Sequence, residues 1–535
     1  MHGYLALVLH AHLPFVRHPE HERFLEENWL FEALTESYLP LLRLLEAWHN
    51  EGLPARLTFT LTPTLCAMLQ DPLLQGRYRR YLAELVELAD KEVHRTLWQK
   101  PLQTLALFYQ ERFQQLEAFY SKCGGDVLGA FRAAQDRGQI EIITSAATHA
   151  LLPLLANHPP SLRAQLLVAR DDYRARFGRD PMGIWLPECA YTEGVESALL
   201  EANIRWFILD SHGLLHARPQ PRYGVFAPIF TPNGLAAFGR DHASAKQVWS
   251  REEGYPGDPA YRDFYRDIGF DLDLDYLKPH LAAPERRGFT GLKYYRITGP
   301  GSTKAPYERQ EALRQAEEHA AHFLQARAAQ FEKLAGVLDR PPLVLAPYDA
   351  ELFGHWWYEG PEFLDLFVRK ACQEELFRLT TLREYLHENP SQQVAEPAAS
   401  SWGEEGFWRV WLNEKNEWIY PHLQVAQERM TELARRYCDS TTPHPGIGPG
   451  VVDRALKQAA RELLLAQASD WPFILRTGTS PDYARKRVND HLLRFTRIYE
   501  QLGTDTLEES WLAQVEAQDN IFPDVNWRYW GSTTA

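Results

Sequence analysis

The sequence predicts an α/β protein in which parallel strands alternate with helices around a closed or nearly closed barrel. Two observations support this: short apolar segments recur along the chain, and amphipathic helical segments separate most of them. With 535 residues, the chain can bury a large core and form two or three structural units. A third observation concerns function. Each apolar segment ends in polar residues, and in such barrels the chemistry collects at the C-terminal strand ends.

Six segments are predicted to be buried strands because each is a short apolar run that ends at polar residues. They are residues 4–9 before HAH, 56–61 before TPT, 140–143 before TSAATH, 184–186 before PEC, 206–209 before DSHG and 343–346 before PYDAE.

The domain organisation follows from the places where this alternation is interrupted. The barrel is assigned to residues 1–385. It is expected to contain a helical insertion at about 72–125 and a loop-rich insertion at about 240–300, which holds many aromatic, Gly and Pro residues. Residues 386–535 show helical periodicity and are predicted to form a C-terminal helical domain that contributes tryptophans to the cleft.

Composition excludes several classes of function. The net charge of -14, without a clustered basic face, argues against nucleic-acid binding. No apolar run approaches the ~18 residues of a membrane span, and the N-terminus lacks the basic flank and cleavage site of a signal peptide, so a cytoplasmic protein is expected. Five scattered cysteines without a CxxC pair favour neither a zinc knuckle nor a disulfide framework. The 16 Trp, 24 Tyr and 26 Phe suit binding of flat, partly apolar rings such as sugars.

Two carboxylates are candidates for catalysis. Glu188 ends the strand in WLPECAY, and Asp349 ends the strand in APYDAELFGHWW. Two acids on one barrel mouth, in aromatic surroundings, can hold unlike pKa values, as glycoside cleavage requires of its nucleophile and its proton donor. An ordinary loop carboxylate is the alternative for each acid alone, and Glu351 is the alternative to Asp349 as the proton donor.

The HAH sequence places His10 and His12 on the same side of a strand. One interpretation is a divalent metal site, with His149, Asp210 and His212 as possible further ligands, which would make the protein a metal-dependent hydrolase or deacetylase. A second is that the imidazoles bind sugar hydroxyls near the acids, and a third is a structural contact with the backbone. The residue pattern leaves all three open.

Tryptophans are concentrated in SSWGEEGFWRVWLNEKNEW. Trp408, Trp411 and Trp418 lie at i, i+3 and i+10, a spacing that predicts one face of a helix. Trp402 lies in the glycine-bounded SWGEEG and is predicted to occupy an exposed loop, where an indole is better placed to stack on a sugar ring than to fill a core.

Five motifs occur in the order that is typical of one enzyme family. HAHLP, GQIEIITSAATHALLP, WLPECAY, APYDAELFGHWW and SWGEEGFW…WLN resemble the five motif regions of glycoside hydrolase family 57. Within the family, KQVWSREEGYPGDPAYRDFYRDIGFDL and SDWPFILRTGT are similar to the 1,4-alpha-glucan branching enzymes. The resemblance implies an incomplete (β/α)7 barrel, an inserted helical region, a C-terminal helical domain and a retaining mechanism that uses neither metal nor another cofactor.

The resemblance also implies roles for particular residues. Glu188 would be the nucleophile and Asp349 the general acid/base. The residues expected to bind substrate are His10, His12, His149, Trp29, Trp249, Trp402 and Trp411.

The activity implied is cleavage of an α-1,4 glucan and transfer of the piece to a 6-hydroxyl, with a family 57 α-amylase or 4-α-glucanotransferase as alternatives that share the catalytic residues. One departure favours water as a competing acceptor. Branching enzymes often carry a tyrosine on a mobile loop over the site, and the corresponding residues 231–241, TPNGLAAFGRD, contain Phe238 but no tyrosine. Substantial side hydrolysis is therefore expected.

Overall fold

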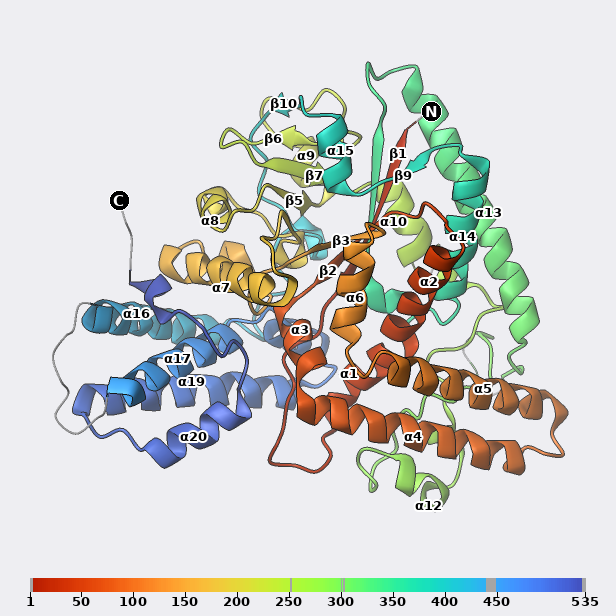
Figure 1. Ribbon diagram of the computed structural model, residues 1–535, viewed down its shortest axis with the longest axis horizontal. Coiled ribbons are helices and arrows are strands. Elements are labelled where there is room, and N and C mark those ends of the chain that lie inside the picture. The colour runs from red at the N-terminus through yellow and green to blue at the C-terminus, as the bar shows by residue number, and fades with distance from the viewer. Residues whose placement is uncertain (1–2, 251–252, 300, 302–303, 439–448, 532–535) are drawn as a thin grey trace.

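The computed structural model describes residues 3–250, 253–299, 301, 304–438 and 449–531. Within these residues ten β-strands form two sheets, and helices surround the sheets and extend beside them (Figure 1). The predicted α/β class is confirmed.

The first sheet is entirely parallel. It contains β1 (Tyr4–Ala11), β2 (Leu57–Leu61), β3 (Ile140–Ile143), β8 (Leu343–Asp349) and β9 (Arg378–Leu379). Its order is β3-β2-β1-β8, and β9 pairs with the start of β1. Every residue of β1 is buried. Leu5, Leu7 and Leu9 belong to the same apolar cluster as the surrounding helices, whereas Tyr4, Ala6 and Val8 cluster with strand residues, including those of the second sheet.

The second sheet has the order β10-β6-β7-β5-β4 and is parallel except between β6 and β7. It contains β4 (Gly183–Ile184), β5 (Trp206–Leu209), β6 (Ile229–Phe230), β7 (Ala236–Gly239) and β10 (Gln393–Val394). Two contacts join it to the first sheet. Thr144 and Ile184 form a parallel bridge between the ends of β3 and β4, and the Asp241 N–H after β7 donates to the Leu345 carbonyl of β8 at 2.9 Å.

Most parallel strands are connected through helices that lie against the sheets (Figure 1). α7 shows how the sequence fixes such a helix: Pro159 occupies its first turn, and Gly178 ends it with a left-handed φ of 66°. The connecting helices are α1 (Asn28–Ala33), α2 (Leu39–Asn50), α3 (Pro63–Gln70), α6 (Val127–Asp136), α7 (Pro159–Phe177), α8 (Val195–Glu201), α9 (Ser211–Leu215), α13 (Arg309–Ala335), α14 (Gly360–Glu374) and α15 (Leu382–Glu388).

The residues of the two predicted insertions contain helices and loops, and their status as insertions stays a prediction. The helical region contains α4 (Pro72–Arg95) and α5 (Lys100–Lys122), which lie side by side at the lower right of Figure 1. The loop-rich region contains the short helices α10 (His242–Trp249), α11 (Ile268–Asp271) and α12 (Leu274–Leu277), and its residues 251–252 and 300 are outside the described part of the chain.

The C-terminal part is helical, and its helices gather at the lower left of Figure 1. They are α16 (Ile419–Cys438), α17 (Pro449–Ala466), α18 (Asp470–Thr477), α19 (Pro481–Thr504) and α20 (Glu509–Gln518). Strand pairing nevertheless continues past residue 385, since β10 pairs with β6.

The predicted helix face of Trp408, Trp411 and Trp418 is wrong. All three tryptophans precede α16 and lie in turns. Asn413 and Asn416 explain the difference: the Asn416 side chain accepts the Asn413 N–H at 2.7 Å, and the Asn413 side chain accepts the Lys415 N–H at 3.0 Å. Such side-chain contacts to the backbone compete with helical hydrogen bonds.

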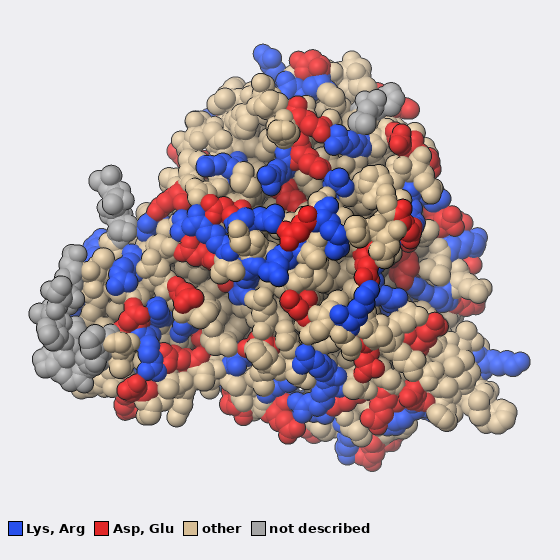
Figure 2. Space-filling view, viewed as in Figure 1, with Lys and Arg blue, Asp and Glu red and all other residues tan. Residues whose placement is uncertain are grey.

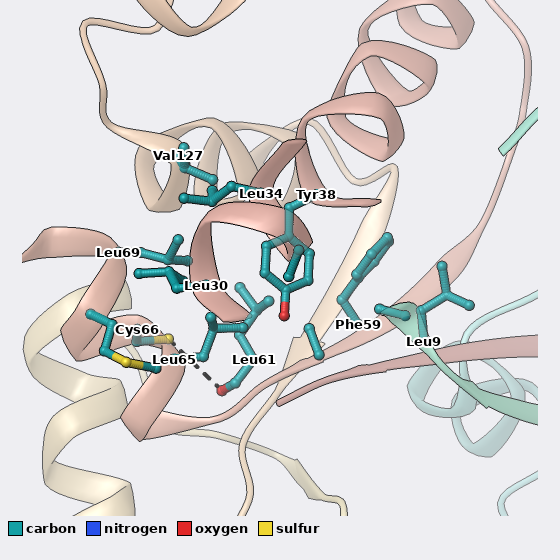
Figure 3. Packing of buried hydrophobic residues seen from close by; sticks show 14 of the residues in the cluster. Leu9, Leu30, Leu34, Tyr38, Phe59, Leu61, Leu65, Cys66, Leu69 and Val127 are labelled. Atoms are coloured by element: carbon teal, nitrogen blue, oxygen red, sulfur yellow. Dashed lines mark hydrogen bonds between the residues drawn. The ribbon is translucent and has the colours of Figure 1, made fainter. Parts of the chain in front are cut away.

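The core is apolar and the surface is mixed in charge. Figure 3 shows strand residues Leu9, Phe59 and Leu61 close to Leu34 and Tyr38, which belong to the π-helical segment Leu34–Tyr38 that follows α1. On the face drawn in Figure 2, Lys and Arg are interspersed with Asp and Glu. In the described ranges, no helix is both long enough and apolar enough to cross a membrane.

Candidate active site

One cavity of about 1260 Å³ collects most of the predicted site residues. Strand ends position several of them: His10 is the second-last residue of β1, Asp349 ends β8 and is paired in register with His10, and Glu188 follows β4. The lining includes His10, His12, His149, Glu188, Trp249, Asp349, Trp402 and Trp411, together with the alternative acid Glu351.

Glu188 is held in a demanding backbone conformation. Its φ of 62° lies in the left-handed region, which costs free energy for a residue with a side chain and which recurs at functional sites. The Trp402 backbone N–H donates to the Glu188 carbonyl at 3.0 Å, so the loop that carries Trp402 is attached to this turn.

Two donors also bind the Glu188 carboxylate. Trp402 Nε1 donates to Oε2 at 2.8 Å, and Ser469 Oγ donates to Oε1 at 3.2 Å. Burial raises the pKa of Glu188 to about 7, while the Trp402 hydrogen bond, the nearby His12 and the Ser469 hydrogen bond oppose the rise. The carboxylate form is thus stabilised by several groups despite its burial.

Asp349 has different surroundings. Burial raises its pKa well above the ordinary value, and the charges of Glu351 and Glu188 raise it further, while Arg240 opposes them. Its carboxylic neighbours therefore favour the protonated form of Asp349.

Glu351 is engaged in structural contacts. Tyr38 Oη donates to its carboxylate, and the His12 backbone N–H donates to the same oxygen at 3.3 Å. Both donors fix Glu351 toward β1 and the Leu34–Tyr38 segment, so it is less available than Asp349 to transfer a proton.

The imidazole of His10 lies between an indole and another imidazole. It stacks on Trp185 with ring centroids 4.4 Å apart, and its Nε2 is 3.1 Å from His149 Nε2. His149 Nδ1 is in turn 2.9 Å from Ser469 Oγ. Burial holds the pKa values of His10 and His149 well below the ordinary range, so both rings are neutral and can each donate and accept a hydrogen bond.

His12 differs because it has a carboxylate partner. Its Nε2 is 3.0 Å from Asp470 Oδ1, and its Nδ1 is 3.1 Å from Thr62 Oγ1. Burial lowers the pKa of His12, but the charge and hydrogen bond of Asp470 outweigh it and leave the pKa raised. His12 can therefore carry a positive charge close to Glu188.

The residues that could hold a metal ion differ in part from those considered in the sequence analysis. Among the described residues, His12, His149 and Asp470 offer ligand atoms within 4.8 Å of one another. However, the rings of His12 and His149 are stacked with centroids 3.8 Å apart and planes 18° apart. The in-plane lone pairs of stacked rings run nearly parallel instead of converging on one ion, which is poor geometry for a zinc site.

Asp210 and His212, the other metal ligands considered, have structural contacts. Arg240 Nη2 pairs with Asp210 Oδ2 at 2.6 Å, His212 Nδ1 is 3.2 Å from Asp210 Oδ1, and His212 Nε2 is 2.8 Å from the Gly406 carbonyl. Neither residue lines the cavity.

The four predicted tryptophans have different positions. Trp249 is half exposed at the end of α10, and its ring centroid is 6.3 Å from that of Trp402. Trp411 is 1% exposed and lies against the Trp402 loop, since a Cβ at Gly403 would be 2.5 Å from its ring. Trp29 does not line the cavity and packs edge-on against Tyr483 with centroids 5.9 Å apart.

The predicted position of Phe238 on a loop over the site is wrong. Phe238 belongs to β7, is buried, and contacts Trp206 edge-on at 5.8 Å. Its segment was not recognised as a strand because AAFG is short and lacks β-branched residues. The lining of the cavity includes instead Arg262, Asp263, Phe264 and Tyr265 of the loop-rich insertion.

Sequence reasoning missed Arg240, Ser469 and Asp470. Ser469 and Asp470 stand in SDWPFILRTGT, a stretch whose resemblance to branching enzymes was a signal for them. Arg240 follows β7, so recognition of that strand would have placed it among the strand-end residues.

Comparisons with protein families agree with this arrangement. The model for glycosyl hydrolase family 57 matches residues 6–398, and the model for the C-terminal region of 1,4-alpha-glucan branching enzymes matches residues 422–530. A 1,4-alpha-glucan branching enzyme of Thermococcus kodakarensis is 31% identical over 98% of this chain and 78% of its own length.

Solved structures are also similar over the whole chain. The alpha-amylase AmyC of Thermotoga maritima matches with a TM-score of 0.93 and 41% identity, covering 100% of both chains. The family 57 branching enzyme of Pyrococcus horikoshii matches with a TM-score of 0.88 and 34% identity, covering 100% of this chain and 97% of the other. The chain therefore belongs to glycosyl hydrolase family 57.

Proposed function

We propose that the protein is a 1,4-alpha-glucan branching enzyme, which cleaves an α-1,4 glucan and transfers the chain to a 6-hydroxyl to form an α-1,6 branch. The observation that carries the proposal is the pairing of Glu188 and Asp349 in one aromatic-lined cavity, in a chain whose C-terminal region matches branching enzymes. The substrate class is amylose or a glycogen-like polymer, and the expected setting is polymer biosynthesis in the cytoplasm.

The surroundings of the two acids assign their roles in a retaining double displacement. Trp402 and Ser469 donate to Glu188, so it is the acid more easily kept ionised, and it attacks the anomeric carbon. Asp349, whose pKa is raised by burial and by neighbouring carboxylates, gives its proton to the departing glycosidic oxygen.

The second step reverses these movements. The acceptor hydroxyl gives its proton to Asp349 while its oxygen bonds to the anomeric carbon, and the electron pair of the ester bond returns to Glu188. His10, His12, His149 and Asp470 line the same cavity as Glu188, which supports a role for them in binding hydroxyls of the sugar bonded to Glu188.

The same proposal includes the finer architecture. The parallel strands β1, β2, β3, β4, β5, β7 and β8, joined by the Thr144–Ile184 bridge and the Asp241–Leu345 hydrogen bond, support an incomplete (β/α)7 barrel. The hairpin α4–α5 and helices α16–α20 then correspond to the inserted and C-terminal helical regions.

A second candidate function is α-amylase activity. The observation in its favour is the 41% identity to AmyC, a protein described as an alpha-amylase, across both full chains. Transferase and hydrolase would share Glu188 and Asp349, because water can replace the glucan hydroxyl in the second step.

Linkage analysis after incubation with amylose separates the two functions. A branching enzyme produces α-1,6 signals in the proton NMR spectrum that grow as the α-1,4 signals decline, with few new reducing ends per branch. An amylase produces reducing ends without α-1,6 signals, and that result would contradict the proposal.

A further inference from the structure

A second group of aromatic residues lines the cavity besides Trp249 and Trp402. It consists of Phe264, Tyr265 and Trp356, all of which line the cavity. Phe264 stacks on Trp356 with centroids 4.6 Å apart and planes 28° apart. Tyr265 is 59% exposed and Trp356 is 54% exposed, so large aromatic faces remain accessible beside the active site. We call these three residues the rim platform.

The rim platform is supported from within the protein. The His355 ring contacts Phe264 and Trp356 edge-on, with centroids 5.3 Å and 5.0 Å away. The buried Lys293 holds its Nζ 4.2 Å from the Phe264 ring centroid.

Buried Glu36 fixes this support. Its Oε2 lies 2.5 Å from His355 Nδ1, and its Oε1 accepts from Arg262 Nη2 at 3.3 Å. Charged groups are costly to bury unless they are paired, so a set of paired charges under exposed rings indicates a preorganised surface rather than a loosely packed edge.

The position of the rim platform relates it to Asp349. The Trp356 backbone N–H donates at 3.1 Å to the carbonyl of Glu351, two residues after Asp349. The Trp402 loop, by contrast, is bonded to Glu188. Trp356 therefore belongs to the chain segment that carries Asp349, whereas Trp402 is bonded directly to Glu188.

The chemistry of a retaining enzyme distinguishes these two sides. The sugar that forms the ester lies over the nucleophile, whereas the glycosidic oxygen and everything beyond it lie at the acid/base. The leaving chain departs from the acid/base side, and the acceptor enters there.

We propose that the rim platform binds a glucosyl ring of the incoming acceptor chain and so favours transfer over hydrolysis. The sugar's C–H face stacks on the Trp356 indole while its hydroxyls remain hydrated. A bound acceptor competes with water at roughly 55 M only through the high effective concentration that such positioning provides. This inference rests on the proposed branching function.

The test separates the two chemical steps. An α-maltosyl fluoride donor loads Glu188 with release of fluoride and leaves the acceptor side empty, and maltoheptaose is then titrated as the acceptor. Trp356→Ala should raise the acceptor concentration for half-maximal transfer about tenfold, the size of one aromatic stacking contact. The rate of fluoride release should change far less than this. Trp356→Phe, which keeps a flat ring, should give an intermediate value.

Trp98→Ala is the matched control, because Trp98 is 91% exposed in the turn between α4 and α5 and does not line the cavity. It should change neither measurement. An unchanged acceptor requirement in Trp356→Ala, or a fall of fluoride release in proportion to transfer, overturns the acceptor role. Wild-type enzyme that releases fluoride but transfers to no acceptor would instead refute the branching function, and the rim platform's role with it.

Discussion

At the scale of single residues, the site depends on the pair formed by Glu188 and Trp402. The indole N–H binds the carboxylate while the same residue's backbone N–H binds the Glu188 carbonyl. Trp402 therefore orients the Glu188 carboxylate and favours its ionised form. Its expected stacking on a sugar ring stays a prediction. A Trp402→Ala variant would disturb the first chemical step as well, so it cannot isolate an acceptor contact as Trp356→Ala can.

Replacing Trp402 with Phe should move the pH dependence of activity. The N–H bond lowers the pKa of Glu188, which burial raises to about 7, so its loss should raise that pKa further. Because Glu188 attacks as a carboxylate, the acidic limb of the kcat/KM profile should move to higher pH, by roughly one unit. Trp249→Phe is the control, since Trp249 contacts Trp402 rather than the carboxylate. Profiles that coincide for Trp402→Phe and wild type would show that the bond does not control ionisation.

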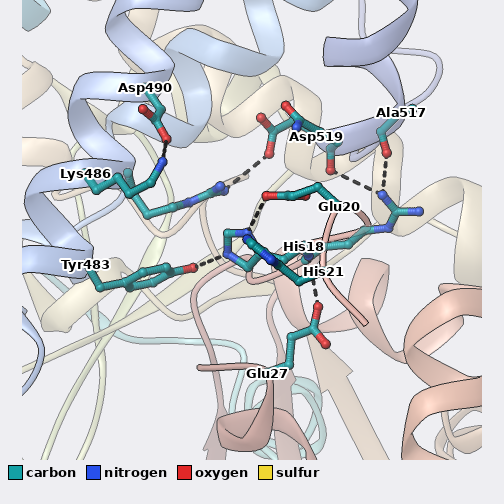
Figure 4. A network of polar contacts seen from close by, with 12 residues as sticks. His18, Glu20, His21, Glu27, Tyr483, Lys486, Asp490, Ala517 and Asp519 are labelled. Atoms are coloured by element: carbon teal, nitrogen blue, oxygen red, sulfur yellow. Dashed lines mark hydrogen bonds and ion pairs between the residues drawn. The ribbon is translucent and has the colours of Figure 1, made fainter. Parts of the chain in front are cut away.

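At the scale of elements, a polar network attaches the N-terminal segment to the C-terminal helices (Figure 4). His18, which follows β1, has its Nε2 2.9 Å from Tyr483 Oη of α19. Asp519, directly after α20, is fully buried between Arg487 at 3.3 Å and Arg494. The helices that deliver Ser469 and Asp470 to the cavity are held in place partly by this network.

Asp519→Ala should be strongly destabilising because it leaves the buried Arg487 without its carboxylate. The expected loss is about 3–5 kcal/mol in the free energy of unfolding, measured by urea titration with circular dichroism. Asp482→Ala is the control: Asp482 is on the same helix as Arg487, its side chain is 98% exposed, and the expected change is within about 0.5 kcal/mol. Equal urea midpoints for the two variants would contradict the network's role.

The network also predicts a dependence on pH. Although burial raises the pKa of Asp519, the charges of Arg487, His491 and Arg494 hold it lowered, to about 2. A carboxyl whose pKa is depressed by folding contributes stability that is fully present above its ordinary pKa of about 4 and is lost as the pH falls toward 2. Stability of wild type should therefore fall more steeply in that interval than stability of Asp519→Ala, which keeps other carboxyls of lowered pKa such as Glu36 but lacks this one.

How much could be predicted from sequence differs between elements. The segments 4–9 and 206–209 were recognisable because buried parallel strands are uninterrupted apolar runs. β7 was not recognisable from its sequence AAFG, since it is a strand because it pairs with β5 and β6. The helix predicted through Trp408 and Trp411 failed because asparagine side chains compete locally with helical hydrogen bonds.

Within the candidate site, strand-end acids and histidines were predictable because they sit next to recognisable strands. Ser469 and Asp470 were harder, since they are more than 100 residues from Asp349 in the sequence. Asp470 lines the cavity and Ser469 bonds to Glu188 only because the helices beside them, α17 and α18, pack against α19. Trp29 does not line the cavity, because it packs against Tyr483 of the C-terminal helices. The sequence around Trp29 does not specify where those helices lie.

At the scale of the whole molecule, we expect catalysis without a metal because of the contacts that His12 makes with the C-terminal helices and with His149. The C-terminal Asp470 pairs with His12, and the stacking of His12 on His149 directs their lone pairs away from a common point. Activity on amylose should survive exhaustive EDTA treatment, and elemental analysis should find less than stoichiometric zinc. Loss of activity on chelation with recovery on added zinc would support the metal-dependent hydrolase instead.

The central claim is that Glu188 forms the glycosyl ester and that Asp349 assists both steps, and trapping the ester tests it most directly. Asp349→Asn treated with α-maltosyl fluoride should accumulate a covalent adduct, because fluoride leaves with little protonic help while the second step lacks its base. Mass spectrometry should find one maltosyl group per chain, located on the peptide that contains Glu188, and none in the Glu188→Gln, Asp349→Asn double variant. An adduct on Glu351 or Asp470, or an undiminished turnover of Asp349→Asn, would contradict the account.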